Sequence, residues 1–129
     1  MEWKKQPNGT TCGQTCTAMI AGISVHESIN MFGTDKGTTM ADGKRILGKL
    51  GIKTGEITKI DNRKKWSLPD FAGVRITGVG RKWGHFIVYK DGQFFDPVYG
   101  VFDSKEELME RYSKHRVKWR FSHYFEVLK

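Results

Sequence analysis

Residues 84–97 read GHFIVYKDGQFFDP, and this stretch decides the fold class. Two runs rich in aromatic and β-branched residues, 84–90 and 93–96, flank Asp91-Gly92, a dipeptide strongly favoured in two-residue hairpin turns. Such a turn sets the register of both strands. The expected cross-strand pairs are Lys90 with Gln93, Tyr89 with Phe94, Ile87 with Asp96, and His85 with Val98. The stretch therefore predicts an antiparallel sheet in the C-terminal half of the chain.

The hairpin register also brings two functional side chains together. His85 and Asp96 become diagonal neighbours on one face, within side-chain reach of each other. A shift of one residue would place them on opposite faces. Simpler interpretations exist for each residue. Asp96-Pro97 is a typical strand end, because proline donates no ladder hydrogen bond, and a histidine at a strand end can bond to the backbone.

The remaining elements follow from apolar spacing and from capping residues. Helices are expected over 12–21, 25–31, 39–50 and 103 or 104 to 114, the first capped by Thr10 or Thr11. Strands are expected over 52–57, 72–77, 84–90, 93–96 and 117–128, with a basic loop at 58–70. In the last strand one apolar face is expected, made of Val117, Trp119, Phe121, His123, Phe125 and Val127. Helices precede an antiparallel sheet, which predicts an α+β fold.

Length and composition fit a single domain over residues 1–129. The chain is 38% hydrophobic, and no apolar run is long enough to span a bilayer. The N-terminus lacks the apolar segment of a signal peptide, so a cytoplasmic location is expected, with a non-classical secretion route left open. The two cysteines, Cys12 and Cys16, are too few for a disulfide framework and are expected to be free thiols.

The charge is unbalanced, with a net value of +8 from 22 basic and 14 acidic residues. Residues 111–129 hold six Lys or Arg against one Glu. A basic region of this kind can bind nucleic acid or anionic lipid, or steer an acidic protein substrate. A solvated basic surface is the favoured interpretation, because no nucleic-acid-binding motif accompanies the charge.

The candidate nucleophile lies in residues 6–20, which read QPNGTTCGQTCTAMI. Cys12 opens the first helix, where free N–H groups and the helix dipole favour the thiolate over the thiol. Cys16 lies one turn deeper, next to Met19 and Ile20 on the apolar stripe, and is interpreted as a packing residue. Taken alone, Cys12 could equally be a small buried hydrophobe. Its combination with a downstream histidine and aspartate is the order that cysteine peptidases use.

These residues resemble a known family. Gln6, five residues, Cys12-Gly13 and a second cysteine four positions later are similar to the N-terminal motif of bacteriocin-processing peptidases, which remove double-glycine leaders. A histidine opening an apolar strand, with Asp96-Pro97 at the end of the next strand, resembles their second motif. The resemblance covers most of the chain. It implies a bacterial or phage protein with a papain-like fold, in which N-terminal helices pack on a C-terminal antiparallel sheet.

The resemblance also implies roles for the site residues. Cys12 would be the nucleophile, His85 the general base and acid, and Asp96 the residue that orients His85. Gln6 would donate its side-chain amide to the oxyanion, together with the Cys12 backbone N–H. Trp83 and Gly84 would shape a cleft for an extended, glycine-containing peptide, although core or surface packing is the simpler interpretation of Trp83. No cofactor is expected.

Three functional hypotheses remain. The first is a thiol peptidase that cleaves a peptide or protein through an acyl-enzyme on Cys12. The second keeps the same residues but acts as a deamidase or transglutaminase-like effector, which papain-like folds also host. The third is a non-catalytic binding module that uses the basic C-terminal region. Many members of the family are fused to a transporter, and no transporter segment is expected after this domain. That difference is also compatible with a free-standing peptidase, a toxin-like effector or a mobile-element protein.

A zinc site is the weakest hypothesis for these residues. Cys12, Cys16, His85 and His123 could supply ligands, but the cysteine spacing is not that of a zinc knuckle. His123 is interpreted instead as a core histidine with its hydrogen bonds satisfied. No metal is therefore expected.

Overall fold

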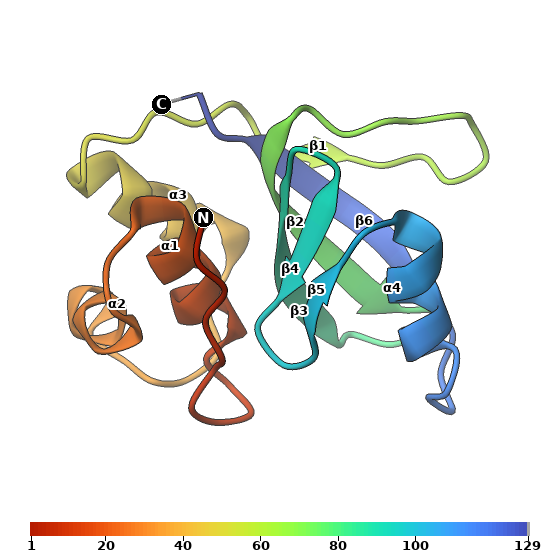
Figure 1. Cartoon of the computed structure of the whole chain (residues 1–129), viewed down its shortest axis with the longest axis horizontal. Coiled ribbons are helices and arrows are strands. Elements are labelled where there is room, and N and C mark those ends of the chain that lie inside the picture. Colours follow the sequence, from red (N-terminus) through yellow and green to blue (C-terminus); the bar gives the residue numbers. More distant parts are fainter. Residues whose placement is uncertain (129) are drawn as a thin grey trace.

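The computed structural model describes residues 1–128 and places three helices on one face of a six-stranded sheet (Figure 1). The helices α1 (Cys12–Ala21), α2 (Val25–Phe32) and α3 (Met40–Lys49) form the N-terminal part. A fourth helix, α4 (Lys105–Tyr112), covers the opposite face. The strands are β1 (Thr58–Lys59), β2 (Phe71–Gly78), β3 (Gly84–Lys90), β4 (Gln93–Asp96), β5 (Gly100–Phe102) and β6 (Trp119–Glu126). The α+β prediction is confirmed.

The sheet has the strand order β1-β6-β2-β3-β4-β5, and every neighbouring pair is antiparallel. The C-terminal strand β6 is inserted between β1 and β2, so the last strand of the chain lies inside the sheet rather than at its edge. Within residues 1–128, no helix is both long and apolar enough to cross a membrane.

The predicted hairpin forms with the expected register. Lys90 pairs with Gln93 and Tyr89 with Phe94, around a turn in which Asp91 and Gly92 both have positive φ, at 49° and 88°. Two-residue turns of the I′ type require this conformation at both positions. The ladder ends at Val88 and Phe95, so the two further pairs expected are not ladder pairs.

Two predictions for the strands are wrong, and one strand is missing from the prediction. Residues 52–57 form no strand. Thr54 makes an isolated bridge with Val127, and the short strand β1 follows at Thr58–Lys59 instead. The strand β5 was not predicted, because its three residues are too few to show a period. The alternating pattern of the last strand does not mark one face, because the register shifts between Arg75 and Ile76.

The register shift moves the apolar residues of β6 to both faces of the sheet. Phe121 pairs with Ile76 and packs in the cluster beneath α4, together with Leu108. Beyond the shift, Phe125 pairs with Gly73 and packs beneath the N-terminal helices. A β-bulge has this effect, because one extra residue reverses the side to which all later side chains point.

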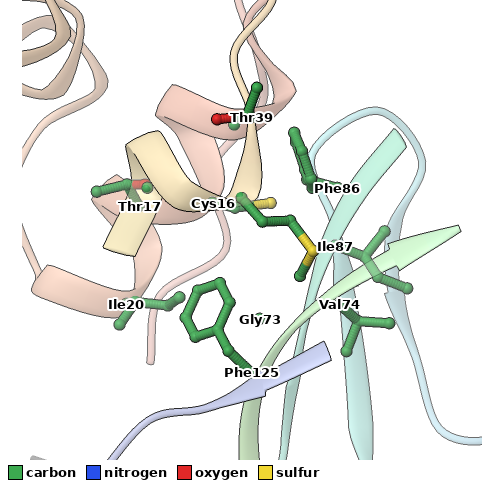
Figure 2. A pocket seen from close by; sticks show the side chains of 12 residues that line it. Cys16, Thr17, Ile20, Thr39, Gly73, Val74, Phe86, Ile87 and Phe125 are labelled. Atoms are coloured by element: carbon green, nitrogen blue, oxygen red, sulfur yellow. The ribbon is translucent and has the colours of Figure 1, made fainter. Parts of the chain in front are cut away.

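The core therefore has two halves, one on each face of the sheet. Beneath α1 and α3 the buried side chains include Cys16, Met19, Met40 and Leu47. A small apolar hollow remains there, and the Phe125 ring covers Gly73 so closely that no Cβ would fit (Figure 2). This packing fixes α1 against the sheet and sets the position of its first residue, Cys12.

Candidate functional site

The site begins at the first turn of α1. Thr11 occupies the N-cap position, but its hydroxyl donates to the carbonyl of Asn8 and does not cap the helix, contrary to prediction. The two following helices do have side-chain caps, from Ser24 and Thr39. No side chain at the N-cap accepts from the N–H groups at the start of α1, and the Gly13 N–H donates to the Cys12 thiol.

Gly13 allows the start of α1 to approach the sheet closely. A Cβ at this position would overlap Oγ1 of Thr38 and lie 3.3 Å from the Phe86 ring of β3. Any larger residue would therefore push Cys12 away from β3. The glycine after the cysteine has a packing reason independent of any family motif.

The two cysteines have opposite electrostatic environments. Burial raises the pKa of the Cys12 thiol, but a hydrogen bond from His85, its positive charge and the backbone N–H groups of Phe86 and Gly13 outweigh burial and lower it. For Cys16, burial and then the negative charges of Cys12 and Asp96 raise the pKa well above the ordinary value. Both cysteines are free thiols, as expected. Only Cys12 is placed to become a thiolate.

His85 and Asp96 are in contact, as the hairpin register predicts. His85, at the start of β3, places its Nε2 3.0 Å from Oδ1 of Asp96, at the end of β4. The histidine side chain is 13% exposed and the aspartate side chain is fully buried. Since Nε2 faces Asp96, Nδ1 is the ring nitrogen left for Cys12. Burial lowers the pKa of His85, but hydrogen bonds and charges of Asp96 and Cys12 raise it to about 9.

Asp96 is held by donors on both carboxylate oxygens. Oδ1 also accepts the backbone N–H of Val98 at 2.9 Å, and Oδ2 accepts the hydroxyl of Tyr112 at 2.5 Å. Burial raises the pKa of Asp96, but His85, Tyr112 and the Val98 N–H outweigh burial and lower it. The aspartate is therefore an ionised group that is fixed in position.

Tyr112 is the site residue that the sequence does not reveal. It is the last residue of α4, on the face of the sheet opposite α1, and it is 3% exposed. Burial and the charge of Asp96 raise its pKa, so that it stays a hydroxyl donor. The rings of His115 and Trp119 pack on it, each with its centroid 5.3 Å away. In the sequence Tyr112 has only the apolar spacing of a helix, which is typical of packing.

The N-terminal segment lies along the turn after β4. Trp3 donates its indole N–H to the carbonyl of Asp96 at 2.7 Å, and the Gln6 backbone N–H donates to Pro97 at 2.8 Å. The Gln6 side-chain amide donates to the Asn8 carbonyl, and its Oε1 is buried without a partner. Within residues 1–128, no hydrogen bond joins Gln6 to Cys12. Its expected role in the oxyanion site stays a prediction.

Trp83 is the last residue of the loop between β2 and β3, and Gly84 is the first residue of β3, directly before His85. Trp83 is 55% exposed, which excludes a core role, and the Arg81 guanidinium lies 5.3 Å from its ring centroid. Gly84 is exposed, and the Arg75 guanidinium lies where a Cβ at this position would point. Both residues therefore line an accessible surface beside the histidine.

The possible zinc ligands do not form a metal site. In the part of the chain that the structure describes, no three His, Cys, Asp or Glu side chains are arranged to hold a metal ion. His123 is half-buried and its Nδ1 is buried without a hydrogen-bond partner, so the expectation of a satisfied core histidine is wrong.

Comparison with known protein families and curated proteins identifies no relative of this chain. No protein-family model matches the chain, and no curated protein matches its sequence. Inference about function therefore depends on the geometry and electrostatics of the site.

Proposed function

We propose that this protein is a papain-like cysteine peptidase that forms an acyl-enzyme on Cys12. The observation that carries the proposal is the line of contacts in which the Cys12 thiol is hydrogen-bonded to His85 and Nε2 of His85 lies 3.0 Å from the buried Asp96 carboxylate. These contacts lower the pKa of Cys12 and raise that of His85 to about 9. Both shifts favour the pair in its charged form, a thiolate beside an imidazolium. A thiolate is the reactive form of cysteine, and a protonated imidazole beside it is the acid that a departing amine needs.

The reaction follows from these charges. The Cys12 thiolate attacks the carbonyl carbon of the substrate, forming a C–S bond, and the carbonyl oxygen becomes an oxyanion. As the C–N bond breaks, the amine leaves with the proton of His85, and a thioester remains. Neutral His85 then removes a proton from water, and the resulting attack on the thioester carbon releases the acid and the thiolate. Atoms and charges balance over the cycle.

Asp96 would keep His85 in the productive orientation. Its Oδ1 contact with Nε2 leaves Nδ1 for the thiol, and its negative charge stabilises the imidazolium. The oxyanion would be stabilised by the backbone N–H of Cys12 and by the side-chain amide of Gln6, because preorganised donors act where charge develops.

The arrangement of layers supports a papain-like fold. Cys12 begins a helix on one side of the sheet, and His85 and Asp96 belong to neighbouring strands. A substrate would bind where the helix and the sheet meet. Trp83 and Gly84 border this surface and would contact the substrate. A peptide or protein substrate fits an open surface of this kind.

The test is mass spectrometry of a peptide library after incubation with the protein. New peptide termini that require Cys12 support the peptidase. A gain of about one mass unit without chain scission would instead identify a deamidase, because a side-chain amide is then the acyl group attacked. Cys12→Ala is the inactive control, and Cys16→Ala, in which the buried packing thiol is removed, should retain the products of the wild type. Equal products from Cys12→Ala and wild type would contradict both.

A further inference from the structure

A broad open groove beside the site is lined by four segments that are distant in the sequence. They are the loop after β1, the strand β2, the β2–β3 turn and the strand β6. We call its cationic lining the basic groove, made of Lys59, Arg63, Arg75, Arg81, Lys82 and Arg120. The only carboxylate among the lining residues is that of Asp61.

Most of this charge is not neutralised within the protein. Arg63 pairs with Asp61 at 3.0 Å, but in residues 1–128 no ion pair joins the other five cations to an acidic side chain. Clustered charge of one sign opposes folding, and it also attracts ligands of opposite charge. The groove is therefore a surface that an anionic partner would complement.

Two of the cations, Arg75 and Lys59, act on the same lining residue, His123. Burial together with the charges of these two residues lowers the pKa of His123. Ser122 and Asn62 also line this part of the groove and add polar side chains to the cationic ones. An extended ligand would meet both charge and hydrogen-bonding capacity.

The basic groove reaches the candidate site. Arg75 lines the groove and packs directly against the Cα of Gly84, the residue before His85. Arg81, also in the groove, lies beside the exposed Trp83 ring. A peptide bound in the groove would therefore lie close to Gly84, the residue that precedes His85, the proposed general base.

We propose that the basic groove binds an acidic, extended segment of the polypeptide that Cys12 attacks. This inference rests on the proposed function, because it takes the groove as part of the substrate surface. A polypeptide is favoured over nucleic acid because the groove leads to a thiol, and a thiolate needs an acyl carbon that a phosphodiester does not offer. Electrostatic attraction of this kind chiefly accelerates encounter with the partner.

The test uses short chloroacetyl peptides, which alkylate a thiol as a C–S bond forms and chloride leaves. One peptide is rich in Asp and Glu, and its match has Asn and Gln at those positions. Each is made with the reactive group at either end. The readout is the rate of Cys12 labelling by the peptide divided by the rate with iodoacetamide, so that differences in thiol reactivity cancel.

We expect the acidic peptide, with the group at one of its ends, to label Cys12 about threefold to tenfold faster than its match at low salt. At about 1 M salt the charges are screened, and the acidic peptide should label Cys12 no faster than its neutral match. The exposed-residue variant Lys82→Gln/Arg120→Gln should lower it, whereas the matched control Lys49→Gln/Lys53→Gln, on another surface, should retain it.

Equal labelling by both peptides at either end would overturn the proposal. So would stronger competition from a single-stranded oligonucleotide than from a free acidic peptide of equal charge, which would assign the groove to nucleic acid. If the acidic peptide labels Cys12 faster than its match but the protein cleaves no peptide, the groove assignment is supported and the proposed peptidase function is contradicted.

Discussion

The Tyr112 hydroxyl donates to Oδ2 of Asp96, while His85 contacts Oδ1 of the same carboxylate. Both partners lie on the α4 side of the sheet, where the centroids of the His85 and Tyr112 rings are 6.3 Å apart. A buried carboxylate with partners on both oxygens is stabilised in its ionised form. Tyr112 is therefore a positioning residue that acts through Asp96.

Tyr112→Phe should destabilise the protein and shift acid unfolding to higher pH. The hydroxyl helps to lower the pKa of Asp96, so its loss allows the carboxyl to take up a proton at higher pH. A hydrogen bond to a charged group contributes about 1.5–3 kcal/mol. Circular dichroism against pH measures the midpoint. Tyr99→Phe is the matched control, because its hydroxyl contacts His115 instead, and a midpoint equal in both variants would contradict the role of Tyr112.

Asp96→Asn should destabilise the protein more at about pH 6 than at about pH 10. The folded pKa of Asp96 is lowered, so its stabilising effect is present above the unfolded pKa and is lost as pH falls through the folded value. The folded pKa of His85 is raised from 6.5 to about 9, so its effect is complete below 6.5 and is lost as pH rises through 9. Above the folded pKa of Asp96 and below that of His85, the aspartate and the imidazolium are both charged.

Removing one partner of a buried ion pair costs about 3–5 kcal/mol, and the cost should fall once His85 is neutral. Urea unfolding of wild type and Asp96→Asn at both pH values measures the difference. A cost that is equal at both pH values would show that the charge of His85 does not contribute.

Gly13→Ala should lower both stability and the reactivity of Cys12. The added methyl group would overlap Thr38 and displace the start of α1 from β3, an overpacking effect of about 1–3 kcal/mol. Gly48→Ala is a matched helical control with no atom within 4 Å of the new Cβ, and it should be neutral or stabilising by up to about 1 kcal/mol. Thermal unfolding and thiol alkylation measure both effects. Similar behaviour of the two variants would argue against the close approach.

The local elements of this fold are predictable because their signals lie within a few residues. Asp91-Gly92 determines the hairpin, and the hairpin brings His85 to Asp96 without information from elsewhere. The start of α1 at Cys12 is likewise local. These features explain why both the fold class and the histidine–aspartate contact could be derived from the sequence.

The parts that escaped prediction depend on distant segments. Tyr112 reaches Asp96 only because α4 packs across the sheet, and no spacing encodes that contact. The register shift near Arg75 exchanges the faces of β6 although its sequence alternates cleanly. The basic groove draws most of its charge from segments outside residues 111–129, where the sequence concentrates lysine and arginine.

The most direct test of the central claim is the rate of Cys12 alkylation by iodoacetamide as a function of pH. The lowered pKa of Cys12 predicts labelling that persists below the pH range of an ordinary thiol and is much faster than labelling of Cys16, whose pKa is raised. His85→Gln, which removes the imidazolium, should return Cys12 to a pH profile at or above the ordinary one. A Cys12 profile that is ordinary in the wild type, or unchanged in His85→Gln, would contradict the thiolate–imidazolium pair and with it the proposed catalytic role of Cys12.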